Sequence, residues 1–241
     1  MLDKTFEILS NNEIAPDTFE LSLGGSAGIE RPGQFINISV GGFFLRRPIS
    51  VHDWTEDSVT VIYKVVGQGT RALSEMKPGE KLSALTPLGN GYDISKCRGA
   101  VLAIGGGIGV PPMYGLCKAL LAAGKQVHAV LGWNTASEVF HADKFRALGI
   151  PVTVCTADGS LGERGFVTDV LPEGYDYFCA CGPEPMLKAV YGKTRSSGQL
   201  SFEARMGCGF GACMGCSCET LAGPKRICRD GPVMEKEEIK W

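Results

Sequence analysis

Residues 100–124 read AVLAIGGGIGVPPMYGLCKALLAAG, and the chain changes character at this stretch. The apolar run at 100–104 predicts a buried strand, the glycines after it predict a turn, and the segment from residue 113 predicts a helix. Strand, turn and helix together make one β-α unit. Strand-like and helix-like segments then alternate to about residue 196. This alternation favours a parallel sheet with helices on both faces.

The chain before this unit is rich in short β-type segments separated by Gly, Pro and Asp, a pattern typical of a small antiparallel barrel. A short helix is expected at 70–76, between the fifth and sixth segments. The segments are TFEILS, TFELSL, QFINISV, RRPISV, SVTVIYKVV and EKLSALTPLG.

The regular pattern stops near residue 199, where a Gly- and Cys-rich stretch begins. This stretch is too short and polar to bury an apolar core of its own, so the rest of the chain must hold it. We therefore expect an α+β multidomain fold. Its parts are an antiparallel β-barrel domain at 1–97, an α/β parallel-sheet domain at 98–199 and a small C-terminal domain at 200–241.

The overall composition excludes several classes of protein. A formal net charge of -2 gives no electrostatic footprint for nucleic acid. The N-terminus lacks a basic start followed by an apolar run, and no eighteen consecutive residues are apolar, so we expect a cytoplasmic protein without a membrane partner. In a reducing compartment, the five of the ten cysteines that cluster at 208–228 indicate metal binding rather than disulfides. The other five are scattered in apolar or strand-like segments, where we expect them to pack in the core: Cys97, Cys117, Cys155, Cys179 and Cys181.

Four of the cysteines have the spacing of an iron-sulfur site. Cys208, Cys213, Cys216 and Cys228 follow the arrangement C-x4-C-x2-C and then a distant fourth Cys, which is typical of a plant-type 2Fe-2S cluster. The alternative is structural zinc, but zinc motifs usually pair two C-x2-C units and only one is present here. Cys218 is a fifth cysteine, for which we expect the role of a packed thiol.

Two short motifs in the barrel segment suggest phosphate contacts. Arg47 in RRPIS, residues 46–50, can form a fork onto a pyrophosphate. Gly69 and Thr70 in GQGT, residues 67–70, offer an N–H group and a hydroxyl at a helix N-terminus. Two such contacts in one barrel suggest a dinucleotide flavin, although either motif alone is also common as a strand end or a turn.

The glycine turn of the β-α unit suggests a second pyrophosphate site. Gly105, Gly106, Gly107 and Gly109 follow a buried strand and precede a helix, whose N–H groups and dipole favour an anion. The spacing departs from the usual dinucleotide fingerprint, and a tight turn is the alternative.

A second loop is placed similarly at the carboxyl edge of the expected sheet, where ligands bind in open α/β folds. Cys181, Gly182 and Pro183 follow the strand-like YDYFCA, although Cys181 can equally be a buried core thiol. No Arg or Lys occurs in 131–137 or 155–160 to bind a 2′-phosphate, and Asp158 would repel one. NAD is therefore expected rather than NADP.

The order of these motifs resembles the ferredoxin-NADP reductase superfamily: RPxS, GxGT, GGGIGVPPM, then CGPEPM. The resemblance implies FAD in the barrel, with Arg47 and Ser50 on its phosphate and isoalloxazine ring. It also implies that the CGPEPM loop faces the nicotinamide. The further residues expected to contact or flank the flavin are Pro48, Ile49, Ile62, Tyr63 and Lys64, where Ile49 stands at a position that is aromatic in many relatives.

With the cysteine loop and the closing CRDGPV included, the chain resembles the electron-transfer subunits of NAD-dependent dihydroorotate dehydrogenases over nearly its whole length. The resemblance implies a separate catalytic subunit containing FMN, in a heterotetramer of two of each, and electron flow through 2Fe-2S and FAD to NAD+. A reductase subunit for hydrogenase, sulfite reductase or ferredoxin, and a non-enzymatic iron-sulfur sensor, are the alternatives. No catalytic acid or base is expected, and His52, His128 and His141 are expected to be surface or structural residues.

Overall fold

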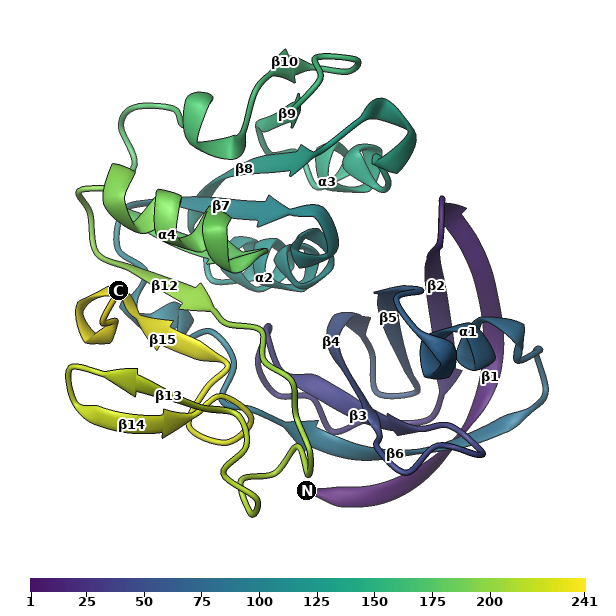
Figure 1. Ribbon diagram of the computed structural model, residues 1–241. Coiled ribbons are helices and arrows are strands. Elements are labelled where there is room, and N and C mark those ends of the chain that lie inside the picture. The colour runs from purple at the N-terminus through teal and green to yellow at the C-terminus, as the bar shows by residue number, and fades with distance from the viewer.

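The computed structural model describes residues 1–241 as a barrel, a sheet with flanking helices and a C-terminal segment beside both (Figure 1). The barrel is closed, and its strands follow the order β1-β2-β5-β4-β3-β6 with every neighbouring pair antiparallel. The strands are β1 (Leu2–Ala15), β2 (Thr18–Gly24), β3 (Phe35–Ser39), β4 (Arg47–Trp54), β5 (Ser58–Lys64) and β6 (Lys81–Leu88).

Alternating side chains form the barrel interior, as the sequence pattern predicted. In β6, for example, Leu82 and Ala84 are buried while their neighbours are not, because successive side chains of a strand point to opposite faces. All six predicted strands are confirmed. Helix α1 (Gln68–Glu75) begins two residues before the predicted position, because the Thr70 hydroxyl caps its N-terminus.

The second part of the chain is a seven-stranded sheet with the order β10-β9-β8-β7-β11-β12-β15. Its strands are parallel except for the last pair, in which β15 runs antiparallel to β12. The strands are β7 (Ala100–Gly106), β8 (Gln126–Trp133), β9 (Val152–Thr156), β10 (Glu163–Arg164), β11 (Tyr177–Cys181), β12 (Gly198–Ser201) and β15 (Val233–Glu235).

Helices cover both faces of this sheet, which confirms the predicted arrangement. Helices α2 (Val110–Ala122) and α3 (Ala142–Ala147) pack on the face to which Val101 and Ala103 point. Helix α4 (Glu184–Lys193) packs on the opposite face with Leu102 and Ile104. None of the helices is both long and apolar enough to cross a membrane.

Residues 136–149, which follow β8 in the alternating pattern, do not form one continuous helix. A 3-10 turn covers Ala136–Glu138, and α3 begins only at Ala142. His141 lies between them in the left-handed region, with φ of 57°. A helix cannot pass through that conformation, so His141 ends one element and precedes the next. Three further 3-10 turns lie at Ile94–Lys96, Gly107–Gly109 and Val167–Asp169.

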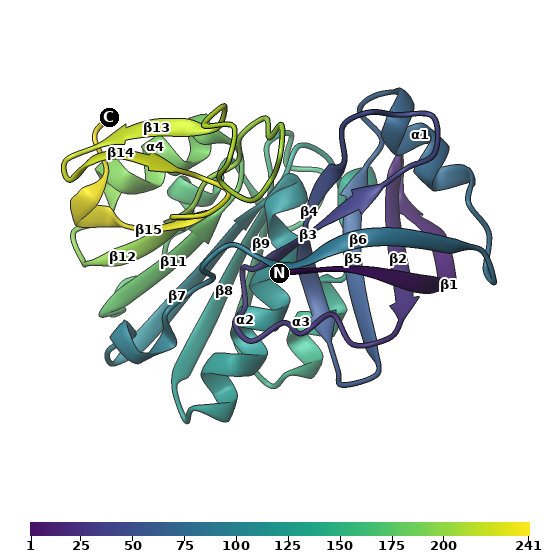
Figure 2. The same cartoon turned by 90° about the horizontal axis from the view of Figure 1, so that it is seen from below.

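The C-terminal segment has little core of its own and is held by the sheet, as its length and polarity predicted. Strand β15 extends the sheet, and the hairpin of β13 (Ser217–Thr220) and β14 (Gly223–Arg226) lies beside it (Figure 2). A last 3-10 turn covers Lys236–Glu238. Ile227 and Ile239 belong to the same apolar cluster as Phe178 of the sheet.

We expect Ile227→Ala to destabilise the protein by about 2–5 kcal/mol, because it removes a side chain that is 2% exposed from this shared cluster. Thermal unfolding followed by far-UV circular dichroism measures the change. Leu221→Ala, on the same hairpin but 69% exposed, is the matched control and should change stability by less than about 0.5 kcal/mol. Equal effects of the two substitutions would contradict this account of how the segment is held.

Candidate cofactor sites

A cavity of about 290 Å³ lies where the barrel meets the carboxyl edge of the sheet, and we call it the barrel cavity. Strand β4, strand β5 and the start of α1 form one wall. The loops after β7, β11 and β12 form the other. Predicted residues that line it are Arg47, Pro48, Ile49, Ser50, Ile62, Tyr63, Lys64, Thr70, Gly109, Cys181 and Gly182.

The Arg47 guanidinium lies against the backbone of Gly69, at the N-terminus of α1. A Cβ atom at Gly69 would be 1.8 Å from Nη2 of Arg47, so a side chain there would displace the guanidinium. Arg47 also stacks over the Phe43 ring, with 5.0 Å between Cζ and the ring centroid. The predicted pair of anion contacts therefore converges at one end of the barrel cavity.

The Thr70 hydroxyl serves the helix itself. Thr70 Oγ1 accepts N–H bonds from Val66 at 3.0 Å and Gly67 at 3.2 Å, and donates to the Gly67 carbonyl at 3.1 Å. Its hydrogen is thus already used. In the first turn of a helix the backbone N–H groups have no intrahelical partner, so those of 68–70 remain the donors for an anion.

Two side chains of β5 are held by protein contacts at the wall of the cavity. Tyr63 donates to Asn11 Oδ1 at 3.1 Å, and burial raises the pKa of its hydroxyl above the ordinary value. Lys64 pairs with Glu138 of the sheet part at 3.2 Å. Tyr63 therefore stays neutral, and Lys64 links β5 to the 3-10 turn after β8.

A second cavity, of about 410 Å³, lies over the carboxyl ends of β7 and β8, and we call it the sheet cavity. Gly106, Gly107 and Pro183 line it together with Trp133 and Asn134. The turn after β7 and the loop after β11 meet here because β7 and β11 are adjacent parallel strands. The two predicted nucleotide motifs thus form one site.

Close packing explains three glycines of this turn, whereas Gly107 has open space beside it and a positive φ of 53°. A Cβ atom at Gly106 would lie 2.2 Å from Sδ of Met186, and one at Gly109 would lie 2.3 Å from the Cys181 carbonyl oxygen. Gly105 lines neither cavity, and a Cβ there would be 2.9 Å from Cα of Val110. Its absent side chain lets α2 approach the strand.

Cys181 lies at the boundary between the two cavities, at the end of β11. Burial raises the pKa of its thiol to about 12, although a hydrogen bond with Ser201 opposes the shift. The thiol is therefore neutral at physiological pH. Cys181 is half-buried: it packs against the apolar core of the sheet and also lines the barrel cavity.

The cysteine loop directs backbone N–H groups at its sulfur atoms. Sγ of Cys208 lies 3.3 Å from the Ala212 nitrogen and 3.5 Å from those of Phe210 and Cys213. Burial opposes ionisation, but these N–H groups, with that of Cys213 the largest contribution, lower the pKa of Cys208 to about 6. A thiolate stabilised in this way suits an iron ligand.

Of the other three predicted ligands, Cys213 is exposed, while Cys216 and Cys228 are buried. Sγ of Cys213 accepts from the Gly215 nitrogen at 3.5 Å, and Sγ of Cys216 from the Cys228 nitrogen at 3.4 Å. Cys218 is half-buried on β13, and burial raises the pKa of its thiol. Small residues and donor groups at the cysteines fit a 2Fe-2S cluster, as the spacing predicted.

Sequence reasoning missed residues that join the parts. Asn37 of β3 donates to the Cys208 carbonyl at 3.2 Å, and its Oδ1 is buried without a hydrogen-bond partner. The segment 201–206 after β12 lines the barrel cavity, as do Phe35, Ile108 and Pro232. The position of 201–206 after a parallel strand was a usable signal, because such ends face the ligand edge of a sheet.

Comparisons with known proteins connect these sites to one family. A family model described as the iron-sulfur cluster binding domain of dihydroorotate dehydrogenase B matches residues 203–240. A protein of Fusobacterium nucleatum described as "Dihydroorotate dehydrogenase B (NAD(+)), electron transfer subunit" is 40% identical over 95% of each chain. One of Bacillus pumilus with the same description is 42% identical over 96% of each chain.

Solved structures share the architecture. An NADH-dependent reduced ferredoxin-NADP oxidoreductase has a TM-score of 0.89 and 33% identity, covering 98% of this chain and 90% of its own. Phthalate dioxygenase reductase has a TM-score of 0.67 and 17% identity, covering 79% of this chain and 64% of its own. The second likeness concerns the fold alone.

We expect Gly69→Ala to weaken FAD binding about ten- to a hundredfold, the value of one charge-assisted hydrogen bond, because the new methyl group displaces the Arg47 guanidinium. Flavin fluorescence during titration of FAD into the deflavinated protein measures the effect. Gly67→Ala is the matched control, since a Cβ there meets no atom within 4 Å. Equal FAD affinity in both variants would show that Arg47 does not contribute to FAD binding.

For the cysteine loop we expect Cys228→Ser to abolish or strongly deplete the 2Fe-2S signal, while Cys218→Ser retains it. The reason is that Cys218 lies outside the C-x4-C-x2-C spacing and is half-buried on β13. EPR of the dithionite-reduced proteins, with iron and sulfide content, measures both. A full signal from Cys228→Ser would refute the ligand assignment.

Proposed function

The chain belongs to the family of electron-transfer subunits of NAD(+)-dependent dihydroorotate dehydrogenase B, and we propose that it passes electrons from a partner catalytic subunit to NAD+. The partner contains FMN and oxidises dihydroorotate in pyrimidine biosynthesis. The electrons enter at the 2Fe-2S cluster and leave through FAD. The three functional parts are an FAD domain at 1–97, an NAD domain at 98–199 and a cluster domain at 200–241.

The observation that carries this proposal is the continuity of the cysteine loop with the barrel cavity. Met206 lines that cavity, and Cys208 follows two residues later. Their Cα atoms are at most about 7.6 Å apart, because consecutive Cα atoms are about 3.8 Å apart. The Asn37 hydrogen bond holds Cys208 against β3 of the same barrel. A redox centre on this loop is therefore next to a flavin in the cavity.

The order of the sites matches the chemistry of the three groups. When bound, the cluster exchanges single electrons, FAD exchanges one or two, and nicotinamide takes up a hydride. The residues of this chain position the groups and exclude water from the boundary between the barrel cavity and the sheet cavity. Gly109 and Gly182 line the barrel cavity, and their near neighbours Gly107 and Pro183 line the sheet cavity, so groups bound in the two cavities lie close to each other.

No catalytic acid or base is needed in this scheme, and the residues at the boundary support that view. The Cys181 thiol and the Tyr63 hydroxyl are both neutral, because burial raises the pKa of each. They can orient and exclude water without adding charge near the flavin. Catalytic residues in the strict sense therefore belong to the partner subunit.

The dinucleotide is NAD rather than NADP in this proposal. Asp158 lies beside Asn134 of the sheet cavity, and its backbone N–H donates to the Asn134 carbonyl at 3.2 Å. Hydrogen bonds from Ser160 lower the pKa of the Asp158 carboxyl, so it is charged at neutral pH. A negative charge there repels a 2′-phosphate.

The partner docks on the outer side of the cysteine loop. Phe210 is 39% exposed and Met214 is 53% exposed, and Cys213 between them is also exposed. Apolar side chains around a redox centre fit a protein interface better than solvent. We propose a cytoplasmic heterotetramer of two copies of each subunit.

A second candidate is a subunit of a ferredoxin-NADP oxidoreductase, favoured by the structure with a TM-score of 0.89. It shares the cofactors and differs in the partner. The higher identity to the electron-transfer subunits, 40% and 42% against 33%, favours the first candidate.

The decisive experiment co-expresses this chain with the FMN subunit from the same source and purifies the complex. We expect orotate formation from dihydroorotate coupled to NAD+ reduction, with a molar mass from light scattering that fits two of each chain. Cys228→Ser should lose this activity but keep NADH-dependent dye reduction, because the dye takes electrons from FAD directly.

A pure complex that reduces dye with NADH but does not oxidise dihydroorotate would reject the dehydrogenase function. Ferredoxin-dependent turnover by the same preparation would then support the second candidate.

A further inference from the structure

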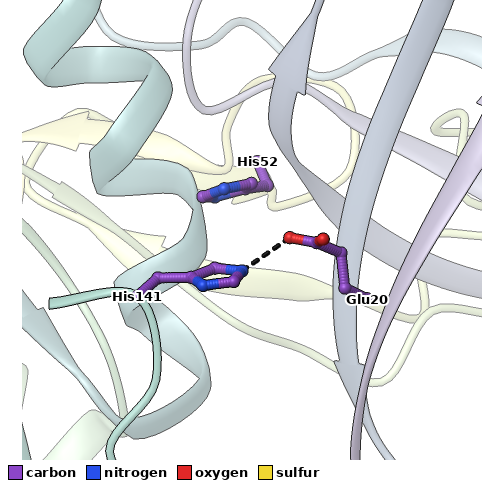
Figure 3. A group of neighbouring side chains, drawn as sticks. All are labelled: Glu20, His52 and His141. Atoms are coloured by element: carbon purple, nitrogen blue, oxygen red, sulfur yellow. Dashed lines mark hydrogen bonds and ion pairs between the residues drawn. The ribbon is translucent and has the colours of Figure 1, made fainter. Parts of the chain in front are cut away.

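Glu20, His52 and His141 form a cluster on the side of the barrel that faces the sheet (Figure 3). Glu20 comes from β2, His52 from β4, and His141 from the residue before α3. Their potential ligand atoms all lie within 4.8 Å of one another. None of the three lines the barrel cavity or the sheet cavity, so the electron-transfer sites do not account for the cluster.

The His52 ring has a fixed tautomer and a lone pair without a partner. Its side chain is buried at 2% exposure, and Nδ1 lies 2.9 Å from the Pro111 carbonyl oxygen. A carbonyl only accepts, so Nδ1 carries the hydrogen and the neutral ring has its lone pair at Nε2. Burial lowers the pKa of His52 to about 4, so the ring is neutral at physiological pH. Metal-binding histidines commonly donate their other ring N–H to a carbonyl in this way.

The contacts of His141 cannot all be hydrogen bonds. Its Nε2 lies 2.5 Å from Glu20 Oε2 and 3.1 Å from Nζ of Lys144. A carboxylate only accepts and an ammonium only donates, whereas one ring nitrogen carries either a proton or a lone pair. If Nε2 carries a proton, it is a donor that faces the ammonium of Lys144, which is also a donor. If Nε2 has no proton, its lone pair faces a lone pair of the Glu20 carboxylate. A cation shared by Nε2 and Oε2 would satisfy both atoms.

We propose that Glu20, His52 and His141 bind a divalent transition-metal ion of the zinc class, through one carboxylate oxygen and the two Nε2 atoms. Two histidines and one glutamate are a known zinc donor set, with a water in the fourth position. Imidazole ligands likewise suit this class of metal better than Mg²⁺ or Ca²⁺.

The ammonium of Lys144 already takes the place of a cation. Nζ lies 2.9 Å from Glu20 Oε2, and the Lys144 side chain is 45% exposed, so it can turn into solvent when a metal enters. Zinc bonds of about 2.0–2.1 Å and tetrahedral angles require ligand atoms roughly 3.3 Å apart. His141 Nε2 and Glu20 Oε2, now 2.5 Å apart, must therefore separate. The more distant donor pairs, within the 4.8 Å span of the cluster, must approach, and the two rings must turn from their stacked arrangement, in which the centroids are 5.5 Å apart.

A metal here would join the barrel to the sheet, because two ligands belong to the first and one to the second. Glu20 is on β2 and His52 is on β4, two barrel strands that flank β5, while His141 directly precedes α3 of the sheet part. Ligands that bind only the folded state stabilise it. The site is therefore an interdomain metal latch, occupied by Lys144 when the metal is absent.

The test uses protein loaded with FAD and the 2Fe-2S cluster, so that the cluster cysteines are occupied. Equilibrium dialysis against zinc chloride with elemental analysis gives stoichiometry and affinity, and the visible spectrum confirms that the cluster stays intact. We expect one zinc per chain, with affinity lowered at least about tenfold in each of E20Q, H52N and H141N. Lys144→Met should raise the affinity, because it removes the competing ammonium.

The substitutions preserve the fold as far as the structure allows. Asn at 52 retains a donor for the Pro111 carbonyl, and Asn tolerates the left-handed backbone at 141. His128→Asn is the matched control: His128 is on β8, outside the cluster, and its ring forms a hydrogen bond with Thr153, so the substitution should leave zinc binding unchanged.

The visible spectrum of bound cobalt(II) provides a second measurement, because it reports the ligand atoms directly and a misfolded variant cannot reproduce it. Tetrahedral cobalt on nitrogen and oxygen ligands gives visible d–d bands without the near-ultraviolet charge-transfer band of thiolate ligands. A thiolate band, the same zinc affinity in a variant combining E20Q, H52N and H141N as in the parent, or no zinc bound by the parent would each overturn the proposal.

Discussion

The packing of helix α2 against barrel strand β4 fixes the position of the barrel relative to the sheet. Gly115 makes it possible, because a Cβ there would lie 2.8 Å from the Trp54 ring and 3.0 Å from the His52 carbonyl oxygen. The bond from His52 Nδ1 to the Pro111 carbonyl then ties the strand to the first turn of the helix. Since α2 begins at the glycine turn after β7, the same contact positions that turn beside the barrel cavity. Two groups that must exchange a hydride gain from such a fixed geometry.

The cysteine loop depends on a different set of contacts, because it has no core that could fold alone. Asn37 anchors Cys208 to the barrel, and Asn90 anchors β15 by donating to the Val233 carbonyl at 2.7 Å. Ile227, between these points, is buried with the side chains of the sheet. The loop is therefore fixed to both larger parts, and its distance from the barrel cavity follows from the fold of the whole chain.

Local patterns explain how much could be predicted from the sequence. The six barrel strands, the β-α unit and the cysteine motif each depend on residues close together in the sequence. The periodicity of apolar residues and the spacing of the cysteines therefore predicted them. The left-handed His141 that breaks 136–149, the capping hydroxyl of Thr70 and the bond from Asn37 to Cys208 depend on the surroundings of each residue. The last joins residues 171 positions apart. No pattern within a short window carries that information.

The ten cysteines show how one residue type serves two purposes in the same chain. Burial without nearby donors raises the pKa of Cys117 to about 12 and that of Cys155 to about 11, so these thiols are neutral packing groups. Backbone N–H groups lower the pKa of Cys208 to about 6 despite its desolvation. Cys228 combines both situations, since burial raises its pKa to about 12 although the spacing of the motif predicts it as a ligand. A coordinating metal removes the proton from such a thiol outright. The N–H groups favour the thiolate form of Cys208, but the buried Cys228 thiol loses its proton only when iron binds.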